Sequence, residues 1–221
     1  MIARTGWEDG IKSPAVVAEM KMSEFWVPSH AHLDAGSFQI YYKGPLANDT
    51  GYYATNVGTG SNTDNGGRTY FGSVHFFNYY RRTIAHNCML IYDPNEKIVS
   101  ANNYGVTPIN DGGQRYYGDA GPATYEEFQD NYEGQIKMAE TLAHEYGIDP
   151  IEPNYTYLKG DLSYAYSDKI SGYERSFMFL NLKNEAHPAA ILVFDRVESS
   201  NPEFKKTWLL HGTDEPQING T

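Results

Sequence analysis

The chain has 221 residues, of which 40% are hydrophobic and 14% aromatic. This is enough apolar material to bury a core, so intrinsic disorder is excluded. The formal net charge is −11, and no basic stripe would release counterions from a nucleic acid, so we expect no nucleic-acid partner. No run approaches the roughly 18 consecutive apolar residues of a transmembrane helix, so we expect no membrane partner.

Short apolar runs, separated by turn residues, recur along the chain. Each run is apolar, β-branched or aromatic and ends near Gly, Pro, Asn or Asp, as strands do. We predict strands at 38–42, 83–92, 174–182, 189–197 and 205–211. Their close spacing favours an antiparallel sandwich over βαβ units. We therefore expect an all-β fold, one antiparallel β-sandwich domain spanning residues 1–221.

Two other segments are less regular. Thr124 to Glu127 matches a capping box, but Gly134 would interrupt a long helix, so we expect a mixture of loop and short elements over 119–152. This segment carries 9 acidic residues against Lys137 alone. The remaining chain is nearly neutral, and a polyanionic ligand is compatible with it. The polar, Gly/Asn-rich loop 59–68 is expected to border a site.

The most informative motif is His-X-His-Leu-Asp, which places His30, His32 and Asp34 within five residues. Asp49 follows at a distance, and His86 comes later still. Residues at i and i+2 do not face each other on a helix, but they share a face of a strand. We therefore expect these side chains on or beside strands, where an unpaired imidazole or carboxylate is costly to bury.

Two imidazoles and a carboxylate from three separate segments can hold one divalent cation. Imidazole nitrogen and carboxylate oxygen suit Zn²⁺, and three protein ligands leave a fourth position open. Calcium and manganese prefer more oxygen donors. We predict a zinc site formed by His32, Asp49 and His86. The alternative is that all three are ordinary hydrogen-bonded polar residues of the core.

His30 would then lie beside the metal rather than on it. An imidazole with an ordinary pKa of about 6.5 suits a general acid or base near neutral pH, so we predict a catalytic His30. The alternative is a hydrogen bond that supports a ligand. Asp34 either orients His30 or His32 through a ring nitrogen or is a turn residue before Ala35 and Gly36.

Tyrosines and arginines near the motifs are candidates for substrate contact. Tyr53 and Arg82 are our predicted substrate-binding residues; Tyr52, Tyr79, Tyr80, Arg68 and Arg81 are further candidates. The remaining histidines are expected to be structural: His75, His144, His187 and His211.

The sequence resembles the heparinase II/III-like polysaccharide lyases of bacteria, and heparinase II in particular. The resemblance covers nearly the whole chain, and its most specific part is the combination of His-X-His-Leu-Asp with Thr-Ile-Ala-His-Asn. It is carried by residues 4–7, 29–42, 46–51, 82–87, 157–162 and 174–177.

This resemblance implies an N-terminal α/α toroid followed by a central β-sandwich, of which the chain matches the sandwich. It implies zinc ligands at His32, Asp49 and His86 and a catalytic histidine at His30. A tyrosine that acts as acid and base comes from the toroid in this family, so the resemblance does not imply activity for the isolated chain. The N-terminus has no apolar region of a secretory signal and does not read as a domain start, and the C-terminal end stops without a closing element. We therefore expect a fragment of a longer protein.

The implied reaction is β-elimination at the uronic acid of an acidic glycosaminoglycan such as heparin or heparan sulfate, in the bacterial periplasm or outside the cell. A homodimer of the full-length protein is a further expectation. Two alternatives stay open: a non-catalytic, zinc-stabilised carbohydrate-binding domain, and a lyase for another uronate polysaccharide such as alginate. A cupin oxygenase fits poorly, because Ala35 and Gly36 stand where cupins carry a Glu.

Overall fold

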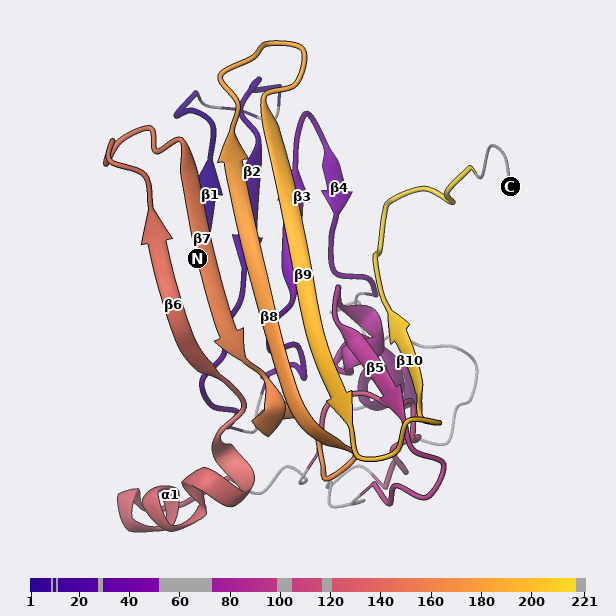
Figure 1. Cartoon of the computed structure of the whole chain (residues 1–221). Helices are drawn as coiled ribbons and strands as arrows, with labels where there is room; N and C mark the ends of the chain where they lie inside the picture. Colours follow the sequence, from indigo (N-terminus) through magenta and orange to yellow (C-terminus); the bar gives the residue numbers. More distant parts are fainter. Residues whose placement is uncertain are drawn as a thin grey trace.

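The computed structural model describes residues 1–8, 10, 12–27, 30–51, 73–98, 105–116 and 121–217. The predicted antiparallel β-sandwich is confirmed, with every strand pair antiparallel (Figure 1). The first sheet has the order β1-β2-β3-β4, formed by Ile2–Arg4, Val17–Met20, Phe38–Tyr41 and Pro45–Ala47. The second has the order β6-β7-β8-β9, formed by Glu140–Tyr146, Tyr155–Asp161, Ile170–Asn181 and Ala189–Ser199.

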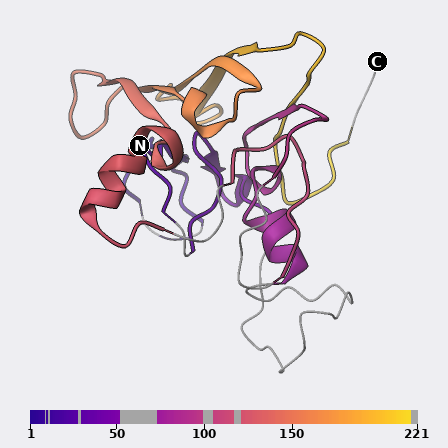
Figure 2. The same cartoon turned by 90° about the horizontal axis from the view of Figure 1, so that it is seen from below.

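A separate two-stranded sheet pairs β5 with β10, Met89–Tyr92 with Lys205–Trp208. The described helical pieces are short: α1 (Tyr125–Asn131), the π-helical turns η1 (Phe76–Tyr80) and η3 (Tyr132–Ile136), and the 3₁₀ turns η2 (Thr83–Ala85) and η4 (Ser163–Ala165). Seen from below, α1 and the segment around η1 lie on different sides of the strands (Figure 2). Within the described ranges, no helix is long and apolar enough to cross a membrane.

The core between the two sheets follows from the alternation along β8. Phe177 and Phe179 are buried, while the residues between them are half-buried, as expected when alternate side chains point to opposite faces. The two rings pack with Met20 and Phe38 of the first sheet. Each fully buried Phe or Met contributes about 1.5–3 kcal/mol of transfer free energy, so this contact fixes how β8 lies over β2 and β3.

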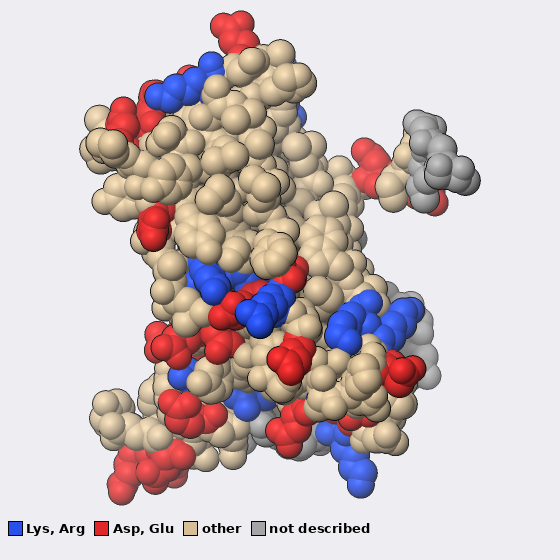
Figure 3. All heavy atoms as spheres, in the orientation of Figure 1, with Lys and Arg blue, Asp and Glu red and all other residues tan. Residues whose placement is uncertain are grey.

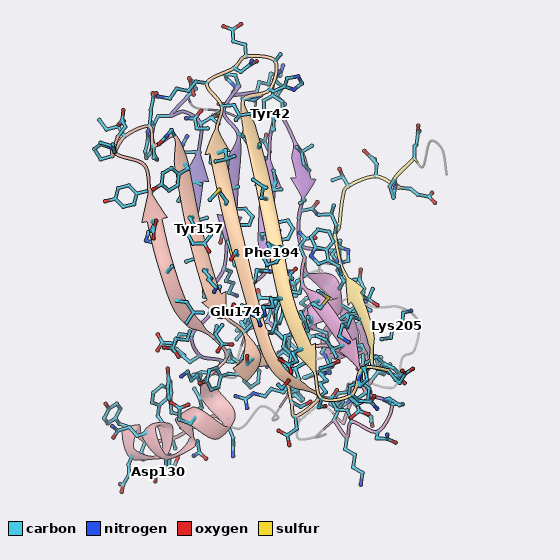
Figure 4. All side chains as sticks on the ribbon, in the orientation of Figure 1. Tyr42, Asp130, Tyr157, Glu174, Phe194 and Lys205 are labelled. Atoms are coloured by element: carbon cyan, nitrogen blue, oxygen red, sulfur yellow. The ribbon has the colours of Figure 1, made fainter. Side chains whose placement is uncertain are left out.

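The outer face of the second sheet has an uncharged region and a charged region. Leu192 and Phe194 of β9 are exposed in an uncharged region over the strands, and Tyr157 lies on the same face (Figures 3 and 4). A belt of charge crosses the sheet below them in Figure 3. It includes an ion pair between Lys159 and Glu174, 2.9 Å apart and partly exposed. Exposed pairs of this kind contribute little to stability.

The predicted strands are found with two changes. The run 83–92 is a strand only over Met89–Tyr92, and its first residues form η2. The cause is the hydroxyl of Thr83, which donates to the carbonyl of Leu33 at 2.8 Å and accepts from the amide of Gln114 at 2.8 Å. Such side-chain bonds compete with a strand ladder. The last run ends early, at Trp208.

Segment 119–152 is mixed, as predicted, although its described part includes the seven-residue strand β6. Thr124 caps α1, because its side chain accepts a bond from the amide of Glu127 at 3.1 Å. Gly134 lies in η3, directly after the helix. The loop 59–68, with Arg68, lies outside the described residues, as do Tyr52 and Tyr53.

Candidate metal centre

The segment that carries His32 is a loop, not a strand, so the expectation of a strand there is wrong. Hydrogen bonds to the main chain hold it instead. The amide of Leu33 donates to the carbonyl of Arg81 at 2.9 Å, and Nε of Arg81 donates back to the carbonyl of Ala31 at 3.0 Å. These bonds fix the path of the loop, and they orient its side chains in the way that strand alternation would in a sheet.

A tight turn ends this loop. The amide of Ser37 donates to the carbonyl of Asp34 at 2.9 Å. Gly36 has a φ of 81°, and a Cβ there would lie 2.4 Å from Cδ1 of Leu162. Only glycine combines that backbone conformation with so close a neighbour. Glycine is therefore required at position 36 of the turn, which has Asp34 at its first position.

A buried network joins this loop to the segment that carries His86. Thr83 bonds to Leu33, as described above, and the side chain of Gln114 bonds to both main-chain groups of Ala35, at 3.0 and 2.8 Å. Thr83 and Gln114 are fully buried. Satisfied buried polar networks of this kind rigidify a site, so the two histidine-bearing segments are held together before any ligand binds.

The structure brings His32, Asp34 and His86 together. One potential ligand atom from each lies within 4.8 Å of the others, and the two imidazole rings are 5.2 Å apart. His86 is fully buried, and neither of its ring nitrogens has a hydrogen-bond partner among the described residues. A buried, unpaired imidazole is costly, and a bound cation would remove that cost.

Asp49 adjoins the same histidine. Its Oδ1 lies 2.9 Å from Nδ1 of His86, yet within the described part of the chain neither atom is in a hydrogen bond of normal geometry. Ligand atoms on one zinc ion, each about 2.0–2.1 Å from the metal, are roughly 3 Å apart. Burial would raise the pKa of Asp49, but the contacts with His86 and His32 lower it overall. Asp49 is therefore ionised beside His86, and the ionised form is the one that binds a metal.

The state of His32 also fits a metal ligand. Burial, reinforced by the nearby His86, lowers the pKa of His32 from 6.5 to about 4. Its imidazole is therefore neutral at physiological pH, which is the form that binds metals. Two imidazoles with an adjacent carboxylate suit Zn²⁺. The described residues thus include a His/Asp group that could hold a metal.

The carboxylate grouped with the two histidines is Asp34, where the sequence had suggested Asp49. Of the two roles left open for Asp34, the structure shows the turn residue before Ala35 and Gly36. Both of its oxygens accept bonds from Nζ of Lys21, at 2.8 Å each. Beside it lies a hollow of about 250 Å³ lined by Glu19, Lys21, Asp34, Ser37, Phe38, Gln39 and Asp49. Three carboxylates against one ammonium disfavour an anionic ligand there.

The other predicted residues have different surroundings. The side chain of His30, two residues before His32, is exposed. Arg82 is buried and forms an ion pair with Asp111 at 2.7 Å, an arrangement that favours a structural role; substrate contact by Arg82 stays a prediction. Tyr80 is also buried, with its ring 5.7 Å from that of His32, so it is not available to stack on a sugar.

Sequence reasoning missed His211, which we had considered structural. Its amide donates to Oδ1 of Asn87 at 2.7 Å. Burial lowers the pKa of His211, and the charges of His86 and Asp49 also act on it. The pairing of β10 with β5 (Trp208 opposite Met89) carries the chain back toward His86. No sequence motif signals this neighbour, because it depends on a strand pairing that spans more than a hundred residues.

No family model matches the sequence, and a search of curated proteins finds no match.

Proposed function

We propose that this chain is the metal-bearing β-sandwich of a polysaccharide lyase that cleaves uronic-acid-containing glycans, of the heparin or heparan sulfate type, by β-elimination. The observation that carries the proposal is the convergence of His32 and His86 with a carboxylate; the exposed His30 lies two residues before His32 in the sequence. The resemblance to heparinase II/III-like lyases supplies the reaction. The antiparallel sandwich is compatible with it.

The reaction needs three groups. The C5 proton of a uronate becomes acidic only when the neighbouring carboxylate is neutralised, a base must remove that proton, and an acid must protonate the leaving O4. Negative charge that develops on the carboxylate needs a positive or hydrogen-bonding neighbour. His30 is exposed and can neutralise the carboxylate or accept the proton. In the family that the chain resembles, a tyrosine of the toroid does the rest.

Zn²⁺ held by His32, Asp49 and His86 would supply a fixed positive charge and order the loop that carries His30. The chain's own residues do the remaining work in this proposal. The Thr83 and Gln114 bonds hold the two ligand-bearing segments, and Lys21 neutralises Asp34. Because the hollow beside Lys21 is rich in carboxylates, we expect an acidic glycan to approach from the side of His30.

The first test is metal analysis of protein purified without added metal. We expect about one zinc per chain, and loss of that zinc in His86→Ala. Chain without zinc would remove the metal from the proposal. The second test follows the ultraviolet absorbance of unsaturated uronate, with this chain and with the longest polypeptide that its reading frame encodes. Heparin and alginate are supplied in parallel to separate the two specificities.

A non-catalytic carbohydrate-binding module is the second candidate. It needs only the antiparallel sandwich and the His32, Asp34 and His86 group, both of which are present in the structure. Heparin that binds without any release of unsaturated product, even with the longest polypeptide, would favour this module over the lyase.

A further inference from the structure

Arg175 is a fully buried guanidinium on the inward side of β8, beneath the loops of the candidate metal centre. Its Nη1 donates to two main-chain carbonyls, that of Gly36 at 2.7 Å and that of Asn87 at 2.8 Å. Gly36 ends the turn that begins at Asp34, and Asn87 directly follows His86. One nitrogen atom thus ties together the two segments that supply the histidines.

The other side of the guanidinium is held by Asp195 of β9. Nε of Arg175 donates to Oδ1 at 2.7 Å and Nη2 to Oδ2 at 2.9 Å, so the pair is bidentate. Asp195 also accepts bonds from the hydroxyl of Tyr173 at 3.1 Å and from Nε1 of Trp208 at 2.9 Å. The planar group is therefore fixed in position and orientation by the second sheet and by β10.

The cost of this arrangement points to a role beyond packing. Burying an ion pair removes two charges from water, and apolar residues of similar volume often stabilise a protein as well or better. An apolar residue could fill the space of Arg175, but it could not bond to both carbonyls at once. The feature that only arginine provides here is a rigid fork that fixes the separation of the two loops.

We propose that Arg175 and Asp195 are a positioning pair for the metal centre: by bonding to Gly36 and Asn87, they set the distance between His32 and His86. The inference rests on the proposed metal-binding function. Neither residue contacts the metal. They act through the main chain, in the way that groups behind metal ligands fix ligand geometry.

The test measures cobalt, because Co²⁺ replaces Zn²⁺ and reports ligand geometry through its visible absorption spectrum. Asp195→Asn keeps the volume of the side chain but weakens its hold on Arg175. We expect cobalt affinity, measured by competition with a chelator, to fall about 10- to 100-fold, as is usual when a group that orients metal ligands is lost. We also expect the cobalt absorption bands to shift.

A matched control is another buried ion pair, Lys169 with Glu96, whose Nζ–Oε2 distance is 2.7 Å. Glu96→Gln also weakens the hold on a buried cation, but the carbonyl to which Lys169 donates is that of Gly113, at 2.6 Å, not that of Gly36 or Asn87. We expect Glu96→Gln to lower the denaturation midpoint while cobalt affinity and spectrum stay as in the wild type.

Trp208→Phe is a milder second variant in case Asp195→Asn does not fold. It removes one bond to Asp195 and retains an aromatic ring near Phe38. We expect a two- to tenfold loss of cobalt affinity, about the worth of one hydrogen bond, with a smaller spectral shift. Folded variants with wild-type affinity and spectrum overturn the positioning role. A wild-type chain that binds no cobalt overturns the metal proposal itself and this inference with it.

Discussion

The ammonium group of Lys21 lies 2.8 Å from each carboxylate oxygen of Asp34, directly beside the two histidines. Asp34 is almost fully buried, and its charge is already compensated. Among the described residues, no lysine or arginine pairs with Asp49 in this way: its Oδ1 contacts the ring of His86 without a hydrogen bond of normal geometry. Two carboxylates therefore lie near one candidate metal site, and Asp49 is more available to a cation than Asp34 is.

The two carboxylates are predicted to differ in their effect on metal binding. Asp49→Asn removes a ligand, so we expect zinc affinity to fall at least about 100-fold, more than the loss of a group behind a ligand. Asp34→Asn keeps a bond acceptor for Lys21, and we expect less than about a tenfold loss. Both values come from competition with a chelating dye. The reverse order would make Asp34 the ligand and Asp49 its support.

His30 and His32 are close in the sequence, but we expect their substitution by alanine to affect different properties, catalysis for His30 and zinc binding for His32. His32→Ala should lose bound zinc, because a ligand is gone. His30→Ala should keep its zinc, because His30 is exposed and is not one of the proposed ligands. If the longest encoded polypeptide has lyase activity, His30→Ala should reduce turnover by about 10²–10⁴-fold, as expected for a general acid or base. Zinc content and ultraviolet absorbance are measured on the same preparations. Unchanged turnover in His30→Ala would remove that residue from the mechanism.

The metal-free protein should lose stability in weak acid through His32. Burial and the nearby His86 lower the pKa of His32 from 6.5 to about 4 in the folded chain. The unfolded chain therefore binds a proton at His32 as the pH falls from 6.5 toward 4, and the folded chain does not. The free energy of unfolding decreases over that interval, and the contribution of His32 is fully present above it.

Urea denaturation of chelator-treated protein at a series of pH values measures this effect. His32→Asn cannot titrate, so its free energy of unfolding should depend less steeply on pH in the same interval. Equal slopes for the wild type and the variant would show that His32 is not held neutral by the fold.

Much of the fold could be predicted, because apolar runs bounded by turn residues are a local signal. The runs at 174–182 and 189–197 became β8 and β9, the two longest described strands. The prediction for 83–92 was wrong where Thr83 found partners in Leu33 and Gln114. Those partners are distant in the sequence, so the composition of the run could not reveal that its first turn would leave the ladder.

The candidate site could be predicted less completely than the fold. The motif spacing identified His32 and His86 correctly as residues that come together. The partner of Asp34 was missed, because Lys21 is 13 residues away and reaches it only when the chain turns back after β2. The neighbourhood of His211 needed the pairing of β10 with β5. Short motifs show which residues can act together, whereas their compensating charges depend on how the strands pair.

Gln114 is predicted to be one of the more costly side chains to truncate in this fold. It is fully buried, and its amide group bonds to both the N–H and the C=O of Ala35. Gln114→Ala leaves two buried main-chain groups without partners, and each costs about 1–3 kcal/mol. We expect the free energy of unfolding to fall by about 2–5 kcal/mol in denaturant titration, with weaker zinc binding because Ala35 follows Asp34.

Gln129→Ala, on the exposed surface of α1, is the control, and its effect should stay within about 0.5 kcal/mol. A similar, small effect of both substitutions would mean that the loop carrying His32 does not depend on Gln114, and that the bonds to Arg81, Thr83 and Arg175 are enough to set its path.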